Sequence, residues 1–174
     1  MTIEHDSVAA IYDNRSSAEE AILALAKSTF DMRNVSVIGR DNSTEEVVVG
    51  FLNPGDRMDV WARTGAFWGQ LAGKLCGSAL FVIPRFGTLF AAGPLVGRVI
   101  HALEGKTDNE GMNILGAGLY SIGIPKLTIE SFEQQLRIGK FIVIAHGAPS
   151  AVASSRTILA RSALLAVRAH ECCA

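Results

Sequence analysis

The sequence predicts an α+β fold in a single domain spanning residues 1–174, and three observations indicate it. Two apolar runs of strand length, SVAAIY at residues 7–12 and FIVIA at residues 141–145, lie near opposite ends of the chain. A segment with apolar residues at helical spacing lies beside each run. The 174 residues, 49% of them hydrophobic, suffice for one domain with a large core.

The N-terminal part predicts the element order β-α-β-β. The strand at residues 7–12 is followed by a helix that Ser16 caps, through a capping box, and that ends near Phe30. Two further strands are expected at residues 35–38 and 46–51, each rich in β-branched residues and bounded by turn residues.

An α-β pair near the C-terminus completes this order. Thr128 is expected to cap a helix that Gly139 ends, and residues 141–145 form a buried strand because they are continuously apolar. Joined to the first half, the pair gives βαββαβ, the order of a ferredoxin-like body. A C-terminal helix from Pro149 to about Arg168, followed by a tail, accounts for residues 149–174.

Residues 56–124 form a glycine-rich apolar insertion, predicted to be a helical hairpin. Glycines recur every four residues, so on the first expected helix, residues 56–83, they line one face; they are Gly65, Gly69, Gly73 and Gly77. Each glycine costs a helix about 1 kcal/mol relative to alanine, which close approach of another helix would offset. Large aromatic residues lie near the start of the apolar part, where they suit a core or subunit contact and also a membrane interface; they are Trp61, Phe67 and Trp68.

Polar residues of the insertion also lie in lines. On the first helix they are Arg63, Gln70, Lys74 and Ser78, and on a second, amphipathic helix over residues 94–104 they are Arg98 and His101. The 18 residues 66–83 reach the length of a transmembrane candidate. Charged residues are costly in lipid, so the polar line favours contact with water or protein. A buried or oligomeric hairpin and a membrane-inserted hairpin both remain open.

Charge and motifs exclude several classes of function. The formal net charge of −1 gives no basic face for nucleic acid. No catalytic signature, phosphate-binding loop or metal-ligand spacing is found, and His170, Cys172 and Cys173 are interpreted as part of a tail. The sequence therefore predicts no enzyme, no cofactor and no metal. The N-terminus has no signal-peptide pattern, so a cytoplasmic protein is expected, with association at the inner face of the cytoplasmic membrane as the alternative.

Several stretches, in this order, resemble a bacterial family described as general-stress or membrane proteins of unknown function. They are VSVIGR (35–40), VGFLNPGDRMDVW (49–61), GAFWGQLAGKLCG (65–77), GPLV (93–96), AGLYSIGIPK (117–126) and GKFIVIAHG (139–147). The resemblance implies a non-enzymatic protein with membrane or envelope association. It supplies no catalytic or ligand-binding residues.

The leading hypothesis is a non-catalytic stress or scaffold protein that associates with itself, its glycine-striped hairpin packing between subunits of a homo-oligomer. The first alternative is a protein whose hairpin inserts into, or lies on, the lipid of the cytoplasmic membrane. A second alternative, based on fold analogy alone, is a sensor domain that binds a small ligand between paired subunits.

Overall fold

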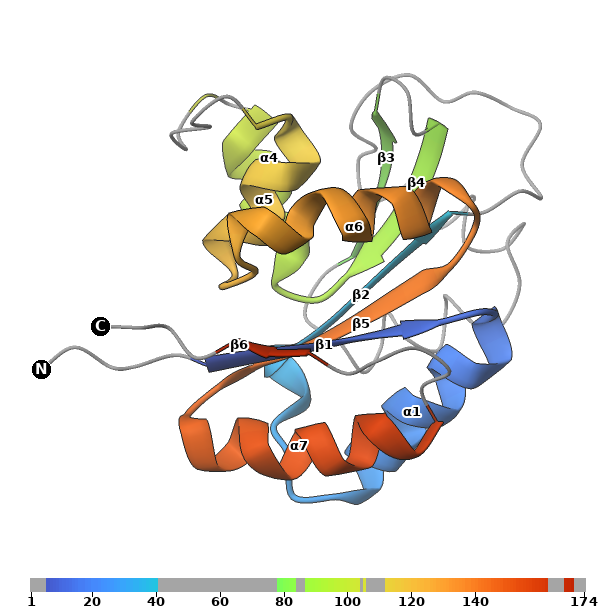
Figure 1. Cartoon of the computed structure of the whole chain (residues 1–174), viewed down its shortest axis with the longest axis vertical. Coiled ribbons are helices and arrows are strands. Elements are labelled where there is room, and N and C mark those ends of the chain that lie inside the picture. The colour runs from blue at the N-terminus through green and yellow to red at the C-terminus, as the bar shows by residue number, and fades with distance from the viewer. Residues whose placement is uncertain are drawn as a thin grey trace, which may run out of the picture.

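The computed structural model describes residues 6–40, 78–83, 87–103, 105, 112–162 and 168–170, and they form one sheet with helices on both faces (Figure 1). The strands are β1 (Asp6–Tyr12), β2 (Val35–Arg40), β3 (Ser78–Ile83), β4 (Gly87–Ala92), β5 (Phe141–Gly147) and β6 (Arg168–His170). The helices are α1 (Arg15–Lys27), α4 (Leu95–Leu103), α5 (Ile114–Ser121), α6 (Lys126–Arg137) and α7 (Pro149–Ser162), with a short 3₁₀ turn η1 (Met32–Asn34). The predicted α+β class is confirmed.

The six strands lie in the order β3-β4-β2-β5-β1-β6, and every neighbouring pair is antiparallel. Strand β5 therefore lies between β1 and β2 and pairs with both along most of its length. The predicted order βαββαβ places this strand last in the body. The chain instead continues through α7 to β6, which pairs with the outer side of β1.

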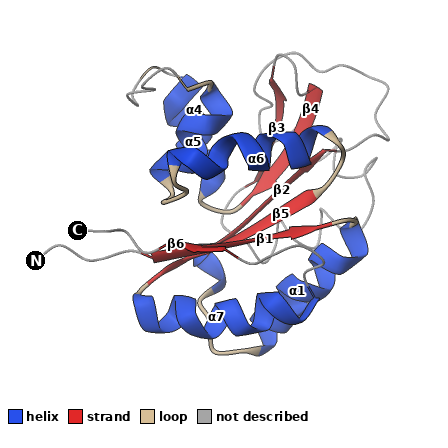
Figure 2. Cartoon of the chain, viewed as in Figure 1, coloured by secondary structure: helices blue, strands red, loops and turns tan. Residues whose placement is uncertain are grey.

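Helices cover both faces of the sheet, α1 and α7 on one and α4, α5 and α6 on the other (Figure 2). Alternate residues of one strand therefore enter different cores: Val143 packs with α1 and α7, whereas its neighbours Ile142 and Ile144 pack with α4, α5 and α6. A strand that is buried on both faces must be apolar at every position, which explains the continuous runs in β1 and β5.

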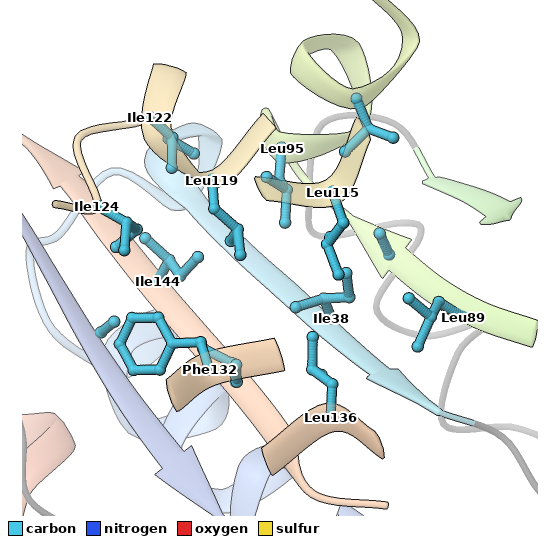
Figure 3. Packing of buried hydrophobic residues seen from close by; sticks show 14 of the residues in the cluster. Ile38, Leu89, Leu95, Leu115, Leu119, Ile122, Ile124, Phe132, Leu136 and Ile144 are labelled. Atoms are coloured by element: carbon cyan, nitrogen blue, oxygen red, sulfur yellow. The ribbon is translucent and has the colours of Figure 1, made fainter. Parts of the chain in front are cut away.

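The second core joins the helices α4, α5 and α6 to the sheet. Figure 3 shows Leu95, Leu115, Leu119 and Phe132 extending from these helices toward Ile38 and Ile144 of the strands. The helix predicted at residues 128–137 is α6, and it lies in this layer rather than beside α1.

Two predicted helix starts are corrected. The cap of α1 is Asn14, whose side chain accepts a hydrogen bond from the backbone N–H of Ser17, and Ser16 lies inside the helix. Helix α6 begins after Pro125, which is the cap residue and has an extended backbone conformation, with its φ fixed by the proline ring. The Thr128 hydroxyl lies in the first turn and donates a hydrogen bond to the Pro125 carbonyl. The predicted helix end at Gly139 is confirmed, because this glycine has a positive φ of 90°.

The predicted long helix over residues 56–83 is wrong at its end, because residues 78–83 form strand β3. This strand pairs with β4, from Ser78 opposite Ala92 to Ile83 opposite Gly87. The pair extends the sheet beyond β2, and its backbone pairing outweighs the helical spacing of the preceding residues. The apolar stretch that the transmembrane reading needed therefore loses its last six residues. The strand predicted at residues 46–51 lies outside the described residues.

The remaining helical predictions differ in their outcome. The amphipathic helix expected at residues 94–104 is α4, with its apolar side buried and Arg98 and His101 exposed. The C-terminal helix was expected to reach Arg168 but ends at Ser162, and Arg168 begins strand β6. Pairing with β1 satisfies backbone groups that would otherwise lie at a sheet edge.

Candidate interaction surface at the sheet edge

Most of the residues that the sequence singled out lie outside the described part of the chain. They are Trp61, Arg63, Gly65, Phe67, Trp68, Gly69, Gln70, Gly73, Lys74 and Gly77. Three remain. Ser78 is the first residue of β3, opposite Ala92, whereas Arg98 and His101 lie on the exposed side of α4. The polar residues assigned to one hairpin are thus divided between a strand and a separate helix.

Glycine-mediated helix packing does occur among the described residues, but within the chain and on α5. A Cβ atom on Gly118 would lie 2.7 Å from Val99 Cγ2 of α4, closer than side chains tolerate. A Cβ atom on Gly116 would lie 3.3 Å from Ile129 Cγ2 of α6. These two glycines let α5 approach both neighbouring helices. The sequence signal for this packing is the pair of glycines two residues apart, which differs from the four-residue spacing of the glycines in residues 65–77.

Strand β3 forms one end of the sheet. It pairs with β4 on its inner side, and no described strand lies on its outer side. Its sequence, SALFVI, contains no charged residue and no proline. Charged residues, prolines and short length are the usual features that keep an edge strand from pairing with another chain. The spacing of the preceding glycines predicts a helix for the same residues, so this edge does not follow from the local sequence pattern.

The opposite end of the sheet differs. Strand β6 has three residues, and a strand this short offers few backbone groups to a partner. Of the two ends, β3 therefore presents the longer and more apolar edge for pairing.

Among the described residues, no group of three or more His, Cys, Asp or Glu side chains is placed to hold a metal ion. The hydrogen bond from the Arg33 side chain lowers the pKa of Asp31 below its usual value of 3.8, but both groups lie on the surface beside η1. Within the same residues, no helix combines the length and the apolar character needed to cross a membrane.

Comparison with known proteins gives no match to this chain among family models, curated proteins or solved structures. The function must therefore be argued from the chain itself.

Proposed function

We propose that this protein is a non-catalytic protein that associates with itself, and that two copies pair through the outer side of β3. The observation behind the proposal is a six-residue apolar strand at one end of the sheet, with no described strand on its outer side. The outward N–H and C=O groups of an edge strand can pair with those of a second copy, which supplies the complementary set.

The geometry of an antiparallel sheet allows this pairing without disturbing the layers. Residues directly opposite each other in neighbouring strands have their side chains on the same face of the sheet. A two-fold axis perpendicular to the sheet therefore places each β3 residue opposite a residue of the other copy that is an even number of positions away. The axis meets this condition when it passes between the two copies of Leu80 or between the two copies of Phe81. In either register the helix layers of the two copies lie on matching faces, and the sheet continues as twelve strands, twice the six of one copy.

The predicted assembly segment is retained in this proposal. Gly77, the last glycine of the four-residue spacing, is bonded to Ser78, the first residue of β3. We infer that residues 65–77 contribute to the same association. The proposal differs from the helical-hairpin hypothesis, because the main contact between the two subunits is now the edge of strand β3 and not a pair of helices.

We also infer that the body is ferredoxin-like, with a different assignment of its elements. The order β2-β5-β1-β6, with α1 and α7 against one face, supports a βαββαβ body made of β1, α1, β2, β5, α7 and β6. The insertion then lies between β2 and β5 and contributes the β3–β4 edge together with α4, α5 and α6.

The association is tested by light scattering on protein from a lysate prepared without detergent. We expect a dimer or a larger discrete species. A monomer at micromolar concentration contradicts the proposal. Recovery in the membrane pellet, with release by detergent alone, contradicts it as well and favours the membrane-associated alternative.

Two proline variants test whether β3 is the contact. Successive residues of a strand direct their N–H groups to opposite sides, so one of Leu80 and Phe81 donates toward β4 and the other outward. We expect proline at the position whose N–H points outward to give a folded monomer. Proline at the position whose N–H points toward β4 should lower the melting temperature. If both variants fold and remain oligomeric, β3 is not the interface.

A further inference from the structure

We draw no further inference here: the strongest candidate, the exposed face of helix α6 with Leu127 near its start and Ile138 at its C-cap, carries no proposal because nothing in the described part of the chain shows what covers it.

Discussion

Gly118 shows how one missing side chain sets the separation of two helices. A Cβ atom there would lie 2.7 Å from Val99 Cγ2 and 3.4 Å from the Val99 backbone. Valine in a helix has one strongly preferred rotamer, so its methyl group cannot turn away at low cost. The glycine therefore stabilises the pair α4–α5 despite its poor helix propensity.

We predict that Gly118→Ala lowers the free energy of unfolding by up to about 2 kcal/mol, because overpacking of about 1–3 kcal/mol outweighs the propensity gain of about 1 kcal/mol. The matched control is Gly97→Ala on α4, where an added Cβ meets nothing within 4 Å. That variant should gain about 0.5–1 kcal/mol. Urea denaturation of both variants measures the difference, and a neutral or stabilising Gly118→Ala would show that the helices can move apart freely.

At the scale of the residue, the sequence predicted the core far better than the candidate sites. Burial of Val8, Ile22 or Val143 follows from spacing and apolarity alone. The candidate contact on the outer side of β3 depends on the pairing of β3 with β4 and of β4 with β2, and no local pattern contains that register. Candidate sites made by register become visible only once the sheet is known.

At the scale of the element, α1 shows how two capping signals compete. Ser16 and Glu19 fit a capping box, whereas Asn14 lies two residues earlier. Asn14 has extended backbone angles, φ −145° and ψ 168°, and its Oδ1 accepts from Ser17 N at 2.9 Å. The earlier cap starts the helix at Arg15 and places Ser16 on its exposed surface.

We predict that Asn14→Ala lowers the stability of the protein by about 1 kcal/mol, the usual cost of losing a cap. Ser16→Ala, two residues away in the same turn, should change stability by less than about 0.5 kcal/mol. Thermal denaturation of the two variants decides between the caps. A larger effect of Ser16→Ala would restore the capping box that the sequence suggested.

The largest errors of sequence interpretation also belong to this scale. Residues 78–83 follow a segment with regular glycine spacing, and their unbroken apolar run fits a buried helix as well as a strand. Pairing with β4 decides between the two, and that partner comes after residues 84–86 in the chain. Similarly, strand β6 follows α7 because its residues pair with the outer side of β1, which lies about 160 residues earlier in the sequence.

At the scale of the whole molecule, two cores share one sheet. An apolar fraction of 49% is compatible with surplus apolar surface for a partner or a membrane. Much of that composition is now accounted for by the strands buried on both faces, since Val8, Ala10 and Tyr12 enter one core and Ala9 and Ile11 enter the other. The proposed self-association therefore depends on the β3 edge rather than on composition.

Because adjacent residues of β1 and β5 pack into opposite cores, the two cores should unfold together. We predict that Ile22→Ala on α1 and Leu119→Ala on α5, both fully buried, each lower the free energy of unfolding by about 2–5 kcal/mol. Each variant should retain a single transition when helix content and tertiary structure are followed by circular dichroism during urea denaturation. The control is Leu127→Ala on α6, whose side chain is 95% exposed and should contribute less than about 0.5 kcal/mol.

If Leu119→Ala instead produced an early transition that left the α1–α7 face intact, the helices α4, α5 and α6 would be a separately unfolding layer. The shared strands would then transmit little stability from one face to the other, in conflict with the alternation of Ile142, Val143 and Ile144 between the two cores.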